Sequence, residues 1–174
     1  MIILLNGTSS SGKSSLAEAL RKTLPEPYFL FGIDNFLEKS LPLGLNFDNE
    51  DDFQHVNTGI SAFHEALGAM AAHIPFMVVG HVLHSKAWFN AVANALAGWP
   101  TYVVQVKASL KTIEERESAR KDRKPGTARA QYDIVYSLPY DLTVDTDLYT
   151  PDHCSKHVQK HLCTGTALMR DKSK

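Results

Sequence analysis

Short apolar runs alternate along the chain with segments whose apolar residues recur every three or four positions. The runs predict five strands, at Ile2–Leu5, Tyr28–Ile33, Phe76–Val79, Thr101–Val106 and Leu142–Val144. The periodic segments predict helices at Lys13–Thr23, Ile60–His73, Lys86–Ala97 and Leu110–Arg120, and Thr150 is expected to cap a last helix that has Pro151 at its first position. Because strands and helices alternate, we expect an α/β fold in which a five-stranded parallel sheet carries helices on both faces.

A glycine-rich loop follows the first predicted strand. Its sequence, GTSSSGKS from Gly7 to Ser14, fits the phosphate-binding pattern G-x-x-x-x-G-K-[ST] in full. Backbone N–H groups of such a loop converge on phosphate oxygens, the lysine reaches the outer phosphates and the serine hydroxyl holds Mg²⁺. We therefore expect ATP and Mg²⁺ here, with Ser14 as the metal ligand and with nucleotide contacts from Gly7, Thr8, Ser9, Ser10, Ser11, Gly12, Lys13, Ser14 and Ser15. A flexible serine-rich turn is the alternative interpretation, but the strand before the loop and the helix after it are the setting that phosphate binding requires.

Several stretches carry a resemblance to a known family. IILLNGTSSSGKSSL, LPEPYFLFGIDNFLEKSLP, EERESARKDR and YDLTVDTD resemble chloramphenicol phosphotransferase and its relatives, with gaps, from Met1 to about Asp147, and the match is poor from Leu43 to Lys86. The resemblance implies a three-layer P-loop kinase fold, one domain over residues 1–174, an arginine-bearing lid at about 117–130 and an acceptor-covering segment at about 41–60. It also implies an ATP-dependent phosphotransferase that acts on a hydroxyl of a small molecule, with chloramphenicol or a related antibiotic among the candidate acceptors.

Asp34 ends the second predicted strand, so we expect it on the same rim of the sheet as the phosphate-binding loop. In the family the matching aspartate is a general base that orients and deprotonates the acceptor hydroxyl, and the resemblance gives Asp34 that role. Such a base contributes about 10²–10⁴-fold to a rate. The competing interpretation is a helix N-cap or turn aspartate in front of Asn35.

A basic stretch lies between the fourth and fifth predicted strands and contains Arg116, Arg120, Lys121, Arg123, Lys124 and Arg129. The resemblance places Arg120 and Arg123 in the lid, where guanidinium groups match the charge of the transferring phosphoryl group and Arg120 also contacts the nucleotide. We expect Lys13, Asp34, Arg120 and Arg123 to be the catalytic residues, and Gly126 to be a hinge. For Arg116, pairing with Glu114, Glu115 and Glu117 on a solvated helix stays an open alternative.

One departure from the family concerns Gly80 and His81, which stand where P-loop proteins usually place an aspartate after the third strand. Mg²⁺ prefers oxygen ligands, so His81 is a poor substitute. Either Ser14, the phosphates, water and Asp34 hold the ion, or catalysis is weakened. His81 and His84 are expected on the active rim, where contact with substrate and simple packing are both open.

Three weaker patterns are weighed in the same way. His153, His157 and His161 recur every four residues, a spacing that can bind metal, but they flank the apolar stripe of the last helix and we favour a wet helix edge. The acidic run at residues 48–52 lacks the spacing of a Ca²⁺ loop and is interpreted as a solvated loop. The segment Leu41–Thr58 is long for a connection, and it offers an apolar wall for the acceptor from Leu43, Leu45, Phe47 and Phe53.

Composition limits the function classes. A net charge of −1 argues against a nucleic-acid partner. No apolar run is long enough for a membrane span or a signal peptide. We therefore expect a cytoplasmic protein that binds a small molecule, and a homo-oligomer stays possible. Cys154 and Cys163 are too few and too far apart to suggest a disulfide. Two alternatives to the small-molecule kinase are kept: a nucleotide-binding switch without phosphotransfer, and a kinase of nucleotide or nucleic-acid ends.

Overall fold

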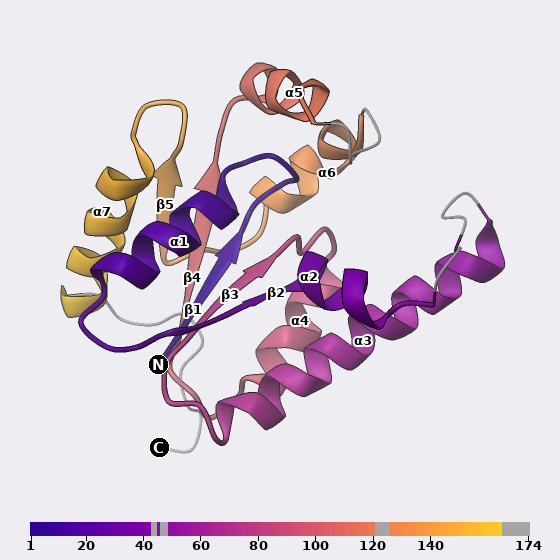
Figure 1. The fold of residues 1–174 in the computed structure, drawn as a ribbon, viewed down its shortest axis with the longest axis horizontal. Coiled ribbons are helices and arrows are strands. Elements are labelled where there is room, and N and C mark those ends of the chain that lie inside the picture. The colour runs from indigo at the N-terminus through magenta and orange to yellow at the C-terminus, as the bar shows by residue number, and fades with distance from the viewer. Residues whose placement is uncertain (43–44, 46–48, 121–125, 165–174) are drawn as a thin grey trace.

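The computed structural model describes residues 1–42, 45, 49–120 and 126–164. Its sheet contains β1 (Ile2–Asn6), β2 (Phe29–Gly32), β3 (Met77–His81), β4 (Thr101–Lys107) and β5 (Leu142–Asp145). All neighbouring strands are parallel, in the order β2-β3-β1-β4-β5 (Figure 1). The predicted fold class is confirmed, and the predicted strand ends differ from the observed ones by at most two residues.

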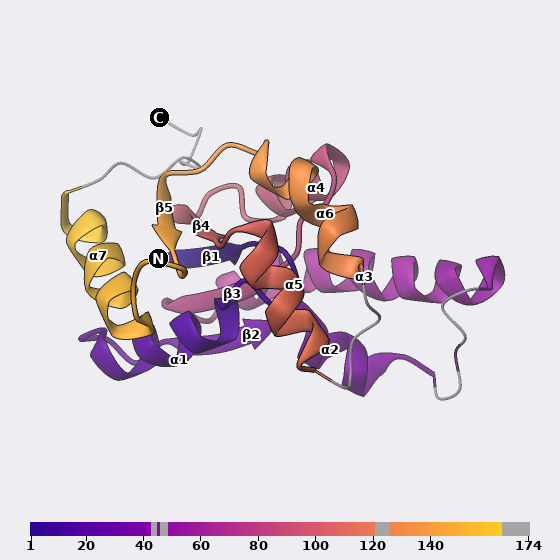
Figure 2. The same cartoon turned by 90° about the horizontal axis from the view of Figure 1, so that it is seen from above.

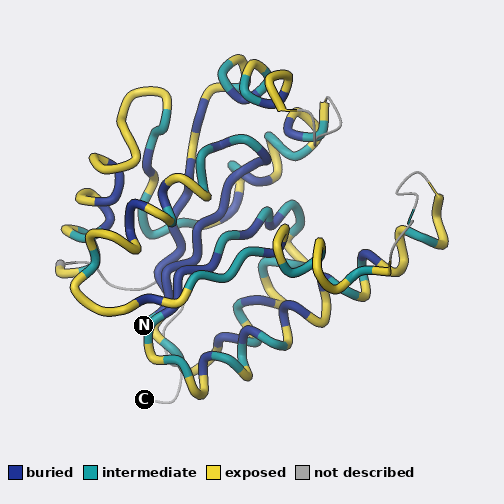
Figure 3. The backbone as a smooth tube through the Cα atoms, in the orientation of Figure 1, coloured by how far each residue is buried: buried dark blue, intermediate teal, exposed yellow. Residues whose placement is uncertain are grey.

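The strands are buried because helices cover both faces of the sheet, and the dark blue centre of Figure 3 shows this burial. On one face, Ile3 and Leu5 of β1 pack with residues of α1 (Lys13–Thr23) and α7 (Pro151–Thr164). On the other face, Ile2 and Leu4 pack with residues of α2 (Ile33–Ser40), α3 (Glu50–Ala71) and α4 (Lys86–Ala95). Alternate residues of one strand therefore belong to two separate cores.

Two further helices, α5 (Leu110–Ser118) and α6 (Thr127–Tyr136), lie over the end of β1 and the loop that follows it (Figures 1 and 2). They share a small core of their own that includes Ala108, Ile113 and Ala128. Helices α2 and α6 were not predicted from the sequence, although the predicted lid range overlaps the start of α6.

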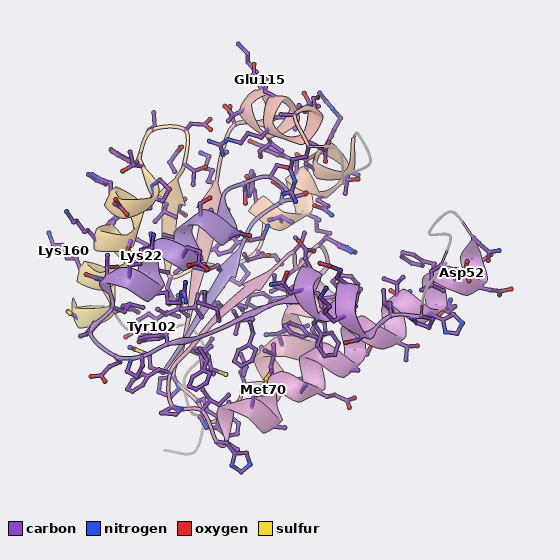
Figure 4. The ribbon with its side chains drawn as sticks, in the orientation of Figure 1. Lys22, Asp52, Met70, Tyr102, Glu115 and Lys160 are labelled. Carbon is purple, nitrogen blue, oxygen red and sulfur yellow. The ribbon has the colours of Figure 1, made fainter. Side chains whose placement is uncertain are left out.

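Helix α3 begins ten residues before the predicted start, so the expected loop at residues 50–58 is wrong. Asn49 caps the helix by accepting hydrogen bonds from the backbone of Asp51 and Asp52, and the acids of the first turn favour the positive end of the helix dipole. The acidic run is thus, from Glu50 on, a helix start rather than a solvated loop. Asp52 lies at the far end of α3, away from the sheet (Figure 4).

Among the described residues, no helix is both long enough and apolar enough to cross a membrane. Of the four residues expected to form an apolar wall, Leu45 packs against the core and Phe53 is exposed on α3, whereas Leu43 and Phe47 lie outside the described residues, as does Asp48.

Candidate active site

The glycine-rich loop connects β1 directly to α1, as the sequence predicts. Gly12 has a φ of 99°, in the region that favours glycine, and it precedes the first residue of the helix. A Cβ atom on Gly7 would lie 2.5 Å from the Val106 carbonyl oxygen, so the loop passes too close to β4 for any side chain there. Both glycines are required by the path of the backbone.

The polar groups of the loop comprise a lysine bonded to the loop backbone and several buried hydroxyls. Lys13 Nζ donates hydrogen bonds to the carbonyl oxygens of Gly7 at 2.9 Å and Thr8 at 2.7 Å. Within the described part of the chain, the buried hydroxyl oxygens of Ser9, Ser10 and Ser11 have no hydrogen-bond partner. Buried polar groups are normally satisfied, so this loop has the unmet hydrogen-bonding capacity expected of a phosphate cradle.

The base of the loop is fixed by Asn6, which is fully buried at the end of β1. Its Oδ1 accepts from the Leu83 backbone at 2.8 Å, and its Nδ2 donates to the Tyr140 hydroxyl at 2.8 Å. Tyr140 donates in turn to the Val135 carbonyl oxygen of α6. The start of the loop is therefore tied both to the segment after β3 and to the helix above it.

A cavity of about 510 Å³ lies beside the loop and brings together most of the predicted site residues. Its walls come from the loop and α1, from α2, from the end of α5 and from the segment between β5 and α7. The lining residues are Ser9, Ser10, Gly12, Lys13, Ser14, Ser15, Leu16, Asp34, Arg116, Ala119, Arg120, Thr146, Tyr149, Pro151 and Cys154. Of the predicted catalytic set, Lys13, Asp34 and Arg120 share this cavity, whereas Arg123 lies outside the described residues together with Lys121 and Lys124.

Asp34 lies on the expected rim, but two residues after β2 rather than at its end. It occupies the first turn of α2, whose N-cap is Gly32, so the N-cap interpretation of Asp34 is wrong. Its side chain is exposed and also lines a second cavity of about 150 Å³, which it shares with Lys13, Ser14 and Gly80. The Asp34 carboxylate therefore lines the same cavities as Lys13 and Ser14, the first two residues of α1.

Among the described residues, Arg116 pairs with Thr146 rather than with the glutamates of its own helix. It donates from both terminal nitrogens to Thr146, to Oγ1 at 3.0 Å and to the carbonyl oxygen at 3.0 Å. Thr146 Oγ1 donates to the Ser11 carbonyl oxygen at 2.8 Å. Arg116 is therefore held against the phosphate-binding loop through Thr146, which was not predicted as a site residue and is marked in the sequence only by its place in the YDLTVDTD stretch.

Three other charged residues of α5 and one of α6 either lie at the surface or join the two helices. Arg129 pairs with Glu114 at 2.6 Å, and both side chains are exposed at the surface. Glu115 points away from the sheet at the outer surface of α5 (Figure 4). Glu117 is buried and accepts from the backbone of Gly126 at 2.8 Å and of Ala128 at 3.0 Å, so it joins the end of α5 to the start of α6.

Tyr149 is a lining residue that the sequence did not single out. Its ring stacks on His153 at 4.4 Å with an interplanar angle of 12°, and the Tyr149 side chain is about half exposed at the cavity wall. An isolated tyrosine between a strand and a helix has no pattern that would have marked it.

His81 turns into the core rather than toward the cavity. It is fully buried, and its Nε2 lies 2.9 Å from Nε2 of His64. Burial, followed by the nearby His64, lowers the pKa of His81 to about 3, and burial also lowers the pKa of His64. The pair is therefore neutral, and of the two interpretations of His81 the packed histidine is correct. The ring of His84 contacts that of Trp88, with the ring centroids 4.0 Å apart and the planes tilted by 48°.

Among the described residues, the histidines of α7 are not brought together into a metal-binding group. His153 contacts Tyr149 and His161 contacts Tyr102, so their rings have separate neighbours. In the described ranges, no group of three His, Cys, Asp or Glu residues is placed to hold a metal ion. Cys154 is buried and Cys163 exposed, and both are free thiols.

Comparisons with known proteins identify the family and the fold of this chain. Residues 1–163 match the family described as "Chloramphenicol phosphotransferase-like protein". The "Putative O-phosphotransferase" of Mycobacterium tuberculosis strain ATCC 25618 / H37Rv is 26% identical over 174 residues, covering 87% of this chain and 77% of that protein.

Two solved kinases share the fold. Shikimate kinase from Acinetobacter baumannii, in complex with shikimate, has a TM-score of 0.69 at 12% identity, covering 94% of this chain and 93% of that one. The APS kinase CysC of Mycobacterium tuberculosis, in complex with AMPPNP and APS, has a TM-score of 0.66 at 19% identity, covering 94% and 97%. At these identities the likeness shows the fold alone, a P-loop kinase fold; the family match indicates a kinase-type phosphotransferase.

Proposed function

The chain belongs to the chloramphenicol phosphotransferase-like family, and from this premise we propose that it transfers the γ-phosphoryl group of ATP to a hydroxyl of a small molecule. The observation that carries the proposal is the cavity of about 510 Å³, because it joins the phosphate-binding loop, one exposed carboxylate and two arginines. A nucleotide-binding site alone needs neither the carboxylate nor the arginines. Their common location favours a site for transfer.

The loop and α1 bind the phosphates. The glycine-dependent path of the loop, its unpartnered hydroxyls and the N-terminus of α1 together suit a group of high negative charge. Lys13 begins that helix and supplies the positive charge for the outer phosphates. Tyr149 and Pro151, which line the cavity from the segment between β5 and α7, offer an apolar wall for the nucleobase.

Asp34 receives the proton of the acceptor hydroxyl. Its carboxylate is solvent-accessible, lies in the same cavity as Lys13 and is carried by a helix that packs on the sheet. A positioned base of this kind contributes about 10²–10⁴-fold to the rate, since phosphoryl transfer needs little covalent assistance. The same position lets Asp34 orient the hydroxyl before transfer.

Arg120 stabilises the charge that spreads over the transferring phosphoryl oxygens, and such an arginine contributes about 10³–10⁵-fold. We assign the same role to Arg123, on the basis of the family resemblance. Arg116 has a different task, because its guanidinium is already committed to Thr146. It supports the loop from α5, directly before the lid proposed for residues 117–130.

Mg²⁺ fits the oxygen donors that the site offers, the Ser14 hydroxyl and the Asp34 carboxylate, which line the same two cavities. When bound, the ion neutralises phosphate charge during transfer. Gly80 lines the second of these cavities and has no side chain to act as a ligand.

We place the reaction in the cytoplasm, where ATP and Mg²⁺ are available. The proposed acceptor is a neutral hydroxylated small molecule, with chloramphenicol and related antibiotics as the first candidates.

The test measures ADP release with a panel of hydroxylated compounds that includes chloramphenicol. Asp34→Asn should lower the acceptor-dependent rate by about 10²–10⁴-fold. The matched control is Glu38→Gln, which changes an exposed carboxylate one turn further along α2 and should leave that rate unchanged. An Asp34→Asn enzyme with wild-type turnover would remove Asp34 from the mechanism.

A regulatory switch without phosphotransfer is the second candidate, because Gly80 and the neutral, buried His81 leave the end of β3 without a carboxylate. The same assay separates the two functions. A switch predicts slow ADP formation at one rate with every acceptor, whereas a kinase predicts a rate that depends on the acceptor present.

A further inference from the structure

Gln131 of α6 holds the backbone of the phosphate-binding loop from above. The Ser9 N–H donates to Gln131 Oε1 at 3.1 Å, across 122 residues of sequence. Because a backbone N–H can only donate, the side-chain atom that faces it must be the carboxamide oxygen. Figures 1 and 2 both show α6 close to the loop after β1.

The same peptide group is held on its opposite side by Lys13. The Thr8 carbonyl oxygen accepts from Lys13 Nζ at 2.7 Å, and the Thr8 carbonyl and the Ser9 N–H belong to one peptide bond. In a trans peptide these two groups point in opposite directions. The peptide between Thr8 and Ser9 is thus clamped between the lysine that begins α1 and the glutamine of α6.

This clamp acts on a strained turn. The Ser11 N–H donates to the Thr8 carbonyl oxygen at 3.3 Å, which closes a turn whose central residues are Ser9 and Ser10. Ser10 has a φ of 61°, an unfavourable conformation for a residue with a side chain. Such a conformation persists where the surroundings hold it. The N–H of the first central residue has no acceptor within a turn of this kind, and Gln131 supplies one.

We propose that Gln131 is a positioning residue for the phosphate-binding loop: it sets the orientation of the peptide between Thr8 and Ser9, and through that peptide the position of Lys13. Glu117 joins α6 to the end of α5, so the loop is also linked to the helices that flank the lid segment. This inference rests on the proposed function, because it treats the loop as an ATP site. It extends that function by naming a residue that prepares the loop without contacting substrate.

The experiment measures the affinity of Mg·ATP by calorimetry for three variants and the wild type. Gln131→Met keeps the length of the side chain but removes the acceptor, and should weaken binding about 5-fold to 20-fold. Gln131→Glu keeps an oxygen for the Ser9 N–H and should bind ATP more tightly than the methionine variant, despite its added negative charge. The matched control, Asp133→Asn, changes an exposed residue of the same helix and should bind as the wild type does.

A second background separates positioning from general stability. Ser10→Gly relieves the strain of the turn, so Gln131→Met should cost less ATP affinity in the Ser10→Gly protein than in the wild type. A purely structural role of Gln131 predicts the same cost in both backgrounds.

Two outcomes overturn the inference. One is tighter ATP binding by the Gln131→Met variant than by the Gln131→Glu variant. The charge at position 131, rather than a hydrogen-bond acceptor for the Ser9 N–H, would then determine the ATP affinity. The other is a loss of ATP affinity on Gln131→Met that is equally large in the Ser10→Gly protein and in the wild type. A wild-type chain that binds no ATP would instead overturn the proposed function, and this inference with it.

Discussion

The buried pair of His64 and His81 should make the stability of the protein sensitive to acid. The two Nε2 atoms lie 2.9 Å apart, so one ring must donate and the other accept. Burial lowers the pKa of both rings, and that of His81 falls to about 3. Replacing the pair by His64→Leu/His81→Leu removes both partners at once, which leaves no unpaired nitrogen in the core.

The sign of the effect follows from proton binding. Below the unfolded pKa of about 6.5, the unfolded chain takes up protons that the folded chain refuses, so stability is complete above that pH and is lost as the pH falls toward the folded pKa. At pH 5 this costs about 2 kcal/mol for His81 alone, and His64 adds to it. The loss is a large fraction of the stability of a domain of this size.

Urea unfolding at pH 8 and pH 5 measures the effect. Between these two values the double variant should lose about 2 kcal/mol less of its free energy of unfolding than the wild type loses. His73→Gln, which changes an exposed histidine of the segment after α3, is the control and should behave as the wild type does. Equal losses in the wild type and the double variant would refute the reasoning, because the pair would then bind protons alike in both states.

Three further predictions concern the site. Tyr149→Ala removes an aromatic face from the cavity and should weaken ATP binding about 2-fold to 10-fold in calorimetry; unchanged affinity would place the nucleobase elsewhere. Arg120→Ala should lower acceptor-dependent turnover about 10³-fold or more, whereas Arg129→Ala, which breaks only a surface pair with Glu114, should not; equal rates for the two variants would contradict the assignment. Gly80→Asp should lower the Mg²⁺ concentration needed for half-maximal activity, since among the described residues a Cβ there meets only the Phe31 carbonyl oxygen, at 3.9 Å; a higher requirement would argue against this location for the ion.

The features that the sequence predicts well are those encoded in neighbouring residues. The phosphate-binding loop is a contiguous pattern, and its flanking strand and helix begin where the apolar periodicity says they do. The buried strands are short apolar runs, which parallel sheets with both faces covered require. These elements could be found because each depends on local sequence alone.

The helices that were missed depend on tertiary contacts. Ile33, Phe36 and Leu37 of α2 have the spacing of an apolar helix face. The segment directly follows a strand, however, and Asp34 was interpreted as the end of that strand rather than as part of a helix. Helix α6 buries few residues, and its start is held by the distant Glu117. The first turn of α3 carries mostly acids, so this segment was predicted to be a loop and Asn49 was not recognised as the N-cap of a helix.

The supporting contacts of the candidate site join residues that are distant in sequence. Arg116 meets Thr146 across 30 residues, and Gln131 meets Ser9 across 122. Neither pair has a pattern that periodicity or motif spacing would reveal. The sequence therefore indicates which side chains have suitable chemistry, and the folded chain decides which of them share a cavity.

Gly80 and His81 illustrate the same point for the missing carboxylate of β3. Neighbouring residues of a strand face opposite sides, so Gly80 lines the cavity with Ser14 while His81 packs against His64. Of these two residues, Gly80 is therefore the one from whose position a carboxylate would reach an ion held by Ser14. If the Asp34 carboxylate binds the ion beside Ser14, it must serve both as a metal ligand and as the acceptor of a proton. These tasks compete, because a carboxylate whose charge is shared with a cation is a weaker base. A second carboxylate at position 80 would separate them, which is why the Gly80→Asp protein is informative about Asp34 as well as about the ion.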